Sequence, residues 1–187
     1  DRVALAGKNS RNWATVYLAV VSYGAVIVPV LSDFAVDEIH HIINHSESRL
    51  FFVSQAIFDK INETAMEDLE GIISLENFEG LHFKTESRKT KHHEFIKEFN
   101  GSTKDRFSAD NYTFTEIDNG SLASIVYTSG TTGFSKGVML SHNCLMANVQ
   151  FFLENLPVED DSRVVSFLPL AHAFGCAFDF LSPFIKG

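Results

Sequence analysis

The sequence predicts an α/β fold built from parallel-sheet βαβ layers. Short apolar runs of strand length recur through residues 1–75, and segments with helical spacing of apolar residues separate them. This alternation implies parallel pairing with right-handed crossovers, and therefore helices on both faces of the sheet. The chain of 187 residues is 45% apolar with only 4 prolines, so it can bury such a core.

The first elements have recognisable boundaries. A strand at 3–7 leads into a helix over 11–23, for which Asn9 and Ser10 are cap candidates and Gly24 is the stop signal. Alternating apolar runs and helical spacing continue to residue 75. The strands expected there are 25–31, 49–54 and 72–75, and the helices are 33–46 and 57–69.

The character of the chain changes after residue 75. Basic and acidic side chains interleave in residues 76–119, which favours a solvated connector or insertion with a helix near 91–99 over a nucleic-acid patch. Residues 120–187 return to apolar patterning and form a third segment of the expected organisation. The elements expected in it are a strand at 122–127, a polar loop at 128–137, a helix at 141–156, a strand at 164–168 and a helix from 173.

Composition excludes several classes of protein. The formal charge of −9 disfavours a general affinity for nucleic acid or anionic membrane, because counterion release needs positive surface. The two cysteines lie far apart without a CxxC pair, which argues against a zinc cluster or disulfide framework and suits a reducing compartment. No signal peptide is visible, and the longest apolar stretch, 16–30, is shorter than the roughly 20 residues that span a bilayer. We therefore predict a cytoplasmic protein.

The loop after the strand at 122–127 carries the strongest chemical signal. It reads Tyr127-Thr-Ser-Gly-Thr-Thr-Gly-Phe-Ser-Lys-Gly137. Its glycines let backbone N–H groups approach an anion, its hydroxyls donate to phosphate oxygens, and its lysine brings positive charge. The residues concerned are Thr128, Ser129, Gly130, Thr131, Thr132, Gly133 and Lys136. The loop predicts a polyphosphate cradle, which makes 120–187 a phosphate-loop segment; the alternative is a surface loop of small polar residues.

Two further features of the loop narrow this prediction. A common P-loop needs Gly before its lysine and Ser or Thr after it, whereas Ser135 and Gly137 stand there. No Asp or Glu occurs from 119 to 153, so an anion would meet no carboxylate from this stretch. Burial of the flanking strand and helix is the alternative reason for part of that depletion.

The ordered loop resembles the signature of the adenylate-forming enzymes. This superfamily includes acyl-CoA synthetases, peptide-synthetase adenylation domains and luciferases, and its pattern is an aromatic residue, Thr-Ser-Gly-Thr-Thr-Gly, any residue and Pro-Lys-Gly. Ser135 replaces the usual proline. The resemblance continues through VMLSHN at 138–143 and FLPLAHAF at 167–174, and through residues 3–32, so only 76–119 lies outside it.

Within the superfamily, FLPLAH and the GAVIVPV segment at 24–30 resemble long-chain fatty acyl-CoA synthetases most. The sequence departs from them at 31–34, where a proline-containing turn is usual, and at Gly175, where an acidic residue is frequent. The resemblance therefore implies a fatty acid substrate and leaves its chain length open.

The resemblance implies a two-step ligase. A carboxylate attacks the α-phosphorus of ATP to give acyl-adenylate and pyrophosphate, and the thiol of coenzyme A then takes the acyl group. The loop at 128–137 would hold the β and γ phosphates, Lys136 would supply charge, Thr128 would be a ligand of Mg²⁺, and His172 would lie at the acyl and thiol end. ATP, Mg²⁺ and coenzyme A as co-substrate are the implied cofactors. A nucleic-acid partner is not implied, a peripheral membrane contact is compatible, and the oligomeric state is open.

Several groups of the family site lie beyond the residues present. They are the adenine-binding segment, the ribose-binding aspartate, a second metal-binding acid and the lysine of the small carboxy-terminal domain. The chain also lacks an initiator methionine. We therefore expect a fragment of the large domain that is inactive by itself. Two rival functions stay open: an adenylation enzyme that serves a carrier protein, and a non-catalytic nucleotide-binding module.

Other reactive side chains have weaker contexts. The histidines of the expected helix at 33–46 include an i,i+4 pair but no HExxH pattern, which favours an exposed helix face over a metal site. The pair at 92–93 is interpreted in the same way. Neither Cys144 nor Cys176 is paired with a base in the sequence, so both are expected to act as small apolar residues. The histidines concerned are His40, His41, His45, His92 and His93.

Overall fold

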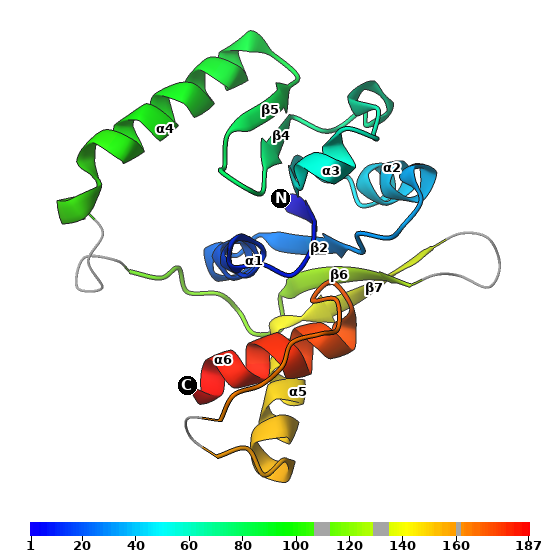
Figure 1. Cartoon of the computed structure of the whole chain (residues 1–187), viewed down its shortest axis with the longest axis vertical. Helices are drawn as coiled ribbons and strands as arrows, with labels where there is room; N and C mark the ends of the chain where they lie inside the picture. The colour runs from blue at the N-terminus through cyan, green and yellow to red at the C-terminus, as the bar shows by residue number, and fades with distance from the viewer. Residues whose placement is uncertain (107–112, 129–134, 160–161) are drawn as a thin grey trace.

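A single mixed sheet of seven strands forms the centre of the fold, with helices on both faces (Figure 1). The computed structural model describes residues 1–106, 113–128, 135–159 and 162–187. The strand order is β5-β4-β3-β1-β2-β6-β7. The strands are β1 (Arg2–Ala6), β2 (Val26–Val30), β3 (Leu50–Val53), β4 (Gly71–Ser74), β5 (Gly80–Phe83), β6 (Leu122–Thr128) and β7 (Lys136–Ser141). The helical segments are α1 (Arg11–Tyr23), α2 (Val36–His45), α3 (Gln55–Phe58), η1 (Glu63–Ala65), α4 (Glu86–Arg106), α5 (His142–Asn155), the π-helical η3 (Gly175–Leu181) and α6 (Ser182–Lys186).

The predicted α/β fold with parallel pairing is confirmed for the central strands. β1 pairs with β2 and β3, β3 pairs with β4, and β2 pairs with β6, all in parallel. β5 and β7 are antiparallel and form the two edges of the sheet. Both follow their neighbour through a connection too short for the crossover that parallel strands need, so each forms a hairpin.

Alternate residues of the strands face two separate cores. Ala4 and Ala6 pack with α2, whereas Val3 and Leu5 pack with α1 on the other face, as the two-residue period of a strand requires. The α1 side of the sheet also receives α5 and η3, through residues such as Val149 and Phe180. The central strands are therefore buried on both faces, and the ends of these strands are left for binding.

Helix α1 begins and ends at the predicted residues. The Ser10 side chain accepts a hydrogen bond from Trp13 N, and Gly24 ends the helix with φ = 85°. That left-handed conformation favours glycine because it has no Cβ. Of the two cap candidates, Ser10 is the cap, and Asn9 is free to bind elsewhere.

Two predicted elements are wrong. Residues 57–69 do not form one helix: α3 ends at Phe58, and the Asn62 side chain binds Thr64 N to start the short turn η1 instead. A local side-chain bond of this kind competes with a continuous helix. Residues 164–168 are not a strand, because no strand in the described ranges forms a ladder with them; Val165 and Phe167 are 76% and 77% exposed.

The connector at 76–119 is more ordered than its composition suggests. It contains the edge strand β5, which was not expected, and α4, which is longer than the helix expected at 91–99. Figure 1 shows α4 standing away from the sheet and touching it at β5. The segment boundaries themselves stay a prediction. Within the described ranges, no helix combines the length and apolarity needed to cross a bilayer.

Candidate functional site

The two ends of the predicted phosphate loop lie opposite each other at the edge of the sheet. Thr128 is the last residue of β6 and Lys136 the first of β7, and the two are cross-strand partners. Both are exposed, and no carboxylate in the described ranges forms an ion pair with Lys136. The predicted binding residues Ser129, Gly130, Thr131, Thr132 and Gly133 lie outside the described residues. The loop leaves the carboxyl end of a parallel strand, where α/β sheets bind ligands.

The strand register also fixes which face Lys136 occupies. Side chains alternate along β7, so Lys136 lies on the same face as Leu140, and Thr128 on the same face as Val126. Leu140 and Val126 both line a cavity on the α1 side of the sheet. The exposed lysine and hydroxyl therefore leave the hairpin on the side where that cavity lies.

The other face of the hairpin is packed and hydrogen-bonded. The buried Tyr127 lies opposite Gly137, where a Cβ would come within 3.2 Å of its ring. Its hydroxyl lies 2.7 Å from Nδ1 of His45 on α2, and burial raises the pKa of Tyr127, opposed by the smaller effect of the Arg2 charge. His45 is thus more than part of an exposed helix face, because it anchors the base of the loop. Sequence reasoning missed this contact.

The cavity beside the hairpin has a volume of about 360 Å³ and is mainly apolar in its lining side chains. A cavity of this size suits the apolar part of a small molecule. Pro29 lines it from β2 and offers no amide hydrogen to β6, which pairs with β2 at Ile27 and Ser124. The other lining residues are Tyr17, Val126, Leu140, Leu145, Asn148, Ala171, His172, Ala173, Phe174, Cys176, Ala177 and Phe178.

His172 is the histidine that lines the cavity. Its hydrogen bonds determine which ring nitrogen can donate to a bound molecule. The backbone N of Phe174 donates to Nδ1 of His172 at 3.2 Å. In the neutral ring, the hydrogen then belongs to Nε2, which is left to donate to a bound oxygen. His172 follows a tight turn in which its own N donates to the Pro169 carbonyl at 2.9 Å. The structure therefore places His172 in the lining of the apolar cavity, on the side of the sheet to which Lys136 points, and its place at the acyl and thiol end stays a prediction.

The described residues near the loop offer few side-chain ligands for the predicted Mg²⁺. Among the described residues, no three His, Cys, Asp or Glu side chains gather in a way that could hold a metal ion. The hydroxyl of Thr128 is an oxygen donor of the kind Mg²⁺ accepts, but Mg²⁺ usually keeps several ligands from water and substrate phosphates. The described part of the site therefore suits an ion that arrives with a phosphate ligand rather than one held in a protein cage.

Comparison with known proteins shows the family and the fold of the chain. The sequence profile described as "AMP-binding enzyme" matches residues 1–187. The chain belongs to the AMP-binding enzyme family. Its fold matches ATP-bound MatB from Rhodopseudomonas palustris with a TM-score of 0.73 and 23% identity, covering 100% of this chain and 33% of that one.

Relatives of this AMP-binding chain include two kinds of fatty acid ligase. The chloroplastic long-chain-fatty-acid–[acyl-carrier-protein] ligase AEE15 of Arabidopsis thaliana is 31% identical, covering 96% of this chain and 26% of the relative. The medium-chain fatty-acid–CoA ligase of Escherichia coli (strain K12) is 27% identical, covering 100% of this chain and 32% of the relative. The chain thus spans about a quarter to a third of the length of these relatives.

The two cysteines of this AMP-binding chain differ in burial and in the pKa of their thiols. Burial raises the pKa of the Cys176 thiol to about 11, and Tyr17 partly offsets this by hydrogen bonding. Cys144 is exposed at the start of α5, and hydrogen bonds with Ser141 lower its pKa. The predicted role of Cys176 as an apolar residue fits its buried place in the cavity wall.

We expect iodoacetamide at pH 7.5 to alkylate Cys176 at least about 10²-fold more slowly than Cys144. The thiolate is the reactive form, and a pKa two units above that of an ordinary thiol lowers its fraction about 100-fold. Peptide mass spectrometry after timed alkylation measures both rates, with the urea-unfolded protein as the control in which the rates converge. Equal rates in the folded protein would contradict a buried, protonated Cys176.

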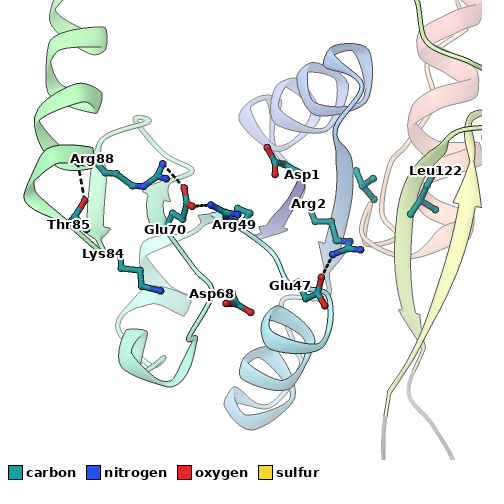
Figure 2. A pocket seen from close by; sticks show the side chains of 11 residues that line it. Asp1, Arg2, Glu47, Arg49, Asp68, Glu70, Lys84, Thr85, Arg88 and Leu122 are labelled. Carbon is teal, nitrogen blue, oxygen red and sulfur yellow. Dashed lines mark hydrogen bonds and ion pairs between the residues drawn. The ribbon is translucent and has the colours of Figure 1, made fainter.

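A second pocket of this AMP-binding fold lies at the other end of the parallel strands, where these strands begin (Figure 2). Its basic side chains are already paired: Arg49 and Arg88 both bind Glu70, and Arg2 binds Glu47. Lys84 donates to the Glu67 carbonyl. Because the charges of its lining side chains balance, this pocket is a poor site for phosphate. The ion pairs instead tie α4 to the starts of β3 and β4.

Proposed function

We propose that the full-length protein activates a fatty acid with ATP and transfers the acyl group to coenzyme A. In the first step, a carboxylate oxygen attacks the α-phosphorus and pyrophosphate leaves. In the second step, the thiol sulfur attacks the acyl carbon, AMP leaves, and the thiol proton is released. The observation that carries this proposal is the position of Lys136 and Thr128 on the cavity side of the hairpin. A phosphate site and an apolar pocket are then neighbours, as an acid and ATP must be to react.

Each part of the site has a defined task in this proposal. Lys136 neutralises charge on the departing pyrophosphate, which needs stabilisation more than it needs covalent help. The hydroxyl of Thr128 is one oxygen ligand of Mg²⁺, which supplies further positive charge to the phosphates when bound. His172 donates through Nε2 to an oxygen of the carboxylate or the adenylate. The cavity wall binds the hydrocarbon, and each buried methylene adds about 0.8 kcal/mol. This gain favours a long acyl chain.

A second acceptor has specific support. The relative with 31% identity is named as a ligase for an acyl carrier protein, so the thiol of a carrier protein is the alternative to coenzyme A. Both acceptors share the first step. They are separated by offering each thiol to the preformed acyl-adenylate and measuring which thioester forms.

Pyrophosphate exchange into ATP tests the common step. We would measure it with the full-length protein and a panel of carboxylic acids from acetate to long-chain fatty acids. We expect exchange that depends on the acid and rises with chain length. A protein that binds ATP but supports no exchange with any acid would instead be a non-catalytic nucleotide-binding module.

We expect His172→Ala to lower acyl transfer about tenfold and leave ATP affinity nearly unchanged, because the phosphate loop is a separate contact. Rapid-quench measurement of acyl transfer, ATP titration and thermal unfolding would be carried out on the same protein. His93→Ala, which removes an exposed histidine from α4, is the matched control. If stability, ATP affinity and transfer all fell in proportion, His172 would be a structural residue only.

A further inference from the structure

The turn that carries His172 is held by a side chain from the other end of the sequence. Asn9 lies between β1 and α1, at the carboxyl edge of the sheet. Its Nδ2 donates to the Leu168 carbonyl at 2.8 Å, and its Oδ1 accepts from Leu170 N at 2.9 Å. A single planar amide therefore binds a backbone acceptor and a backbone donor on either side of Pro169.

Three other contacts complete the anchoring of this turn. The carboxylate of Asp179 accepts from Leu168 N at 3.3 Å, and His172 N donates to the Pro169 carbonyl. Leu170 and Ala171 are buried against the core on the α1 side. The backbone from 168 to 172 is thus fixed at its start, middle and end. Asn9 supplies the link to the β1–α1 connection.

The residues before the turn are held more weakly: the one side-chain hydrogen bond that they form in the described ranges is a long one, from Asn9 Nδ2 to Ser166 Oγ at 3.4 Å. Val165 and Phe167 are mostly exposed, and residues 162–167 have no regular secondary structure. A reacting group must be held to within about 0.5 Å, which an irregular segment achieves only when side chains anchor it. Asn9 is therefore placed where the irregular chain becomes a fixed turn, just ahead of His172.

We propose that Asn9 is a positioning residue that sets the place of His172 in the cavity. This inference rests on the proposed function, because it needs His172 to meet the acyl substrate. Asn9 acts through the backbone of 168–170 and touches no reacting atom in the proposal. Its loss should therefore affect the carboxylic acid and spare ATP.

We expect Asn9→Ala to lower kcat/KM for the fatty acid about tenfold, the effect of losing two hydrogen bonds that hold a reacting group in place, with KM for ATP unchanged. Asn12→Ala is the matched control. Asn12, on α1, also donates to two backbone carbonyls, those of Leu75 and Glu76, but these follow β4 and are not part of the turn at 168–172. Asn9→Asp keeps the side-chain shape and the acceptor for Leu170 N but loses the donor to the Leu168 carbonyl. The same kinetic measurements on this variant test the inference if Asn9→Ala fails to fold.

Hydrogen–deuterium exchange supplies a readout that does not depend on activity. We expect the amides of Leu170 and His172 to exchange at least tenfold faster in Asn9→Ala and to be unchanged in Asn12→Ala. In Asn9→Asp, which keeps the acceptor for Leu170 N, we expect faster exchange at His172 only. Kinetics and exchange equal to those of Asn12→Ala would overturn the inference while leaving the proposed function intact. A parent protein without acid-dependent pyrophosphate exchange would overturn the proposed function and this inference together.

Discussion

Lys136→Ala should slow adenylation about 10²-fold in the full-length protein. The side chain is exposed at the start of β7, directly across from Thr128, and no carboxylate in the described ranges neutralises it. Its charge is therefore available to phosphate, and losing one contact of this kind from a transition state typically costs 10²- to 10³-fold. Acid-dependent pyrophosphate exchange measures the step directly.

The control residue for this substitution lies in the pocket at the amino ends of the parallel strands. Lys84→Ala removes a lysine that donates to the Glu67 carbonyl beside the paired arginines (Figure 2), and it should leave exchange within about twofold of the parent. Lys136→Arg keeps the charge and should retain more activity than the alanine variant. Exchange by Lys136→Ala within about threefold of the parent would remove this lysine from the mechanism.

Gly175→Ala should destabilise the protein and disable the cavity. An added Cβ would lie 2.4 Å from the carbonyl oxygen of Pro169, which is backbone and cannot rotate away. Alanine is a better helix former than glycine by about 1 kcal/mol, but overpacking costs about 1–3 kcal/mol or more, and a backbone collision belongs at the upper end. We expect a net loss of about 2 kcal/mol, and lower acyl transfer because Pro169 begins the turn of His172.

Thermal unfolding and acyl transfer test this substitution together. A loss of that size lowers Tm by about 4–8 °C for a domain of this length. Gly120→Ala is the matched control, because the nearest atom to its added Cβ belongs to the exposed side chain of Asp118, which can move. A Gly175→Ala protein as stable and active as the parent would show that the turn has more room than the structure indicates.

Local signals account for most of the fold that could be predicted. The limits of α1 follow from Ser10 and Gly24. The two cores, one on each face of the sheet, follow from the side chains of β1 and β2, which point to the two faces in turn. Elements whose own residues carry a weak or misleading pattern were missed or wrong. The short strand β5 has only weak apolar character and forms by pairing with β4, whereas the apolar run at 164–168 has no strand partner among the described residues.

The same distinction applies to the site. The roles of the loop ends and of the cavity histidine stay predictions, but Thr128, Lys136 and His172 were singled out from ordered motifs along the chain. Asn9 and His45 were not, because their roles come from hydrogen bonds to residues far away in sequence. An asparagine after a strand looks like a helix cap in sequence, and only the three-dimensional structure shows that Ser10 takes that task and leaves Asn9 for the turn.

The position of β6 has a consequence for how the protein acquires its fold. β6 joins the sheet next to β2, although β3, β4, β5 and α4 intervene in the sequence. Contacts of such long separation form late, because the entropy of closing the loop must be overcome first. During synthesis, β1 to β5 can assemble before β6 leaves the ribosome. The β6–β7 hairpin is then the last part of the sheet to dock, so an immature chain would have its scaffold before the proposed phosphate site could form.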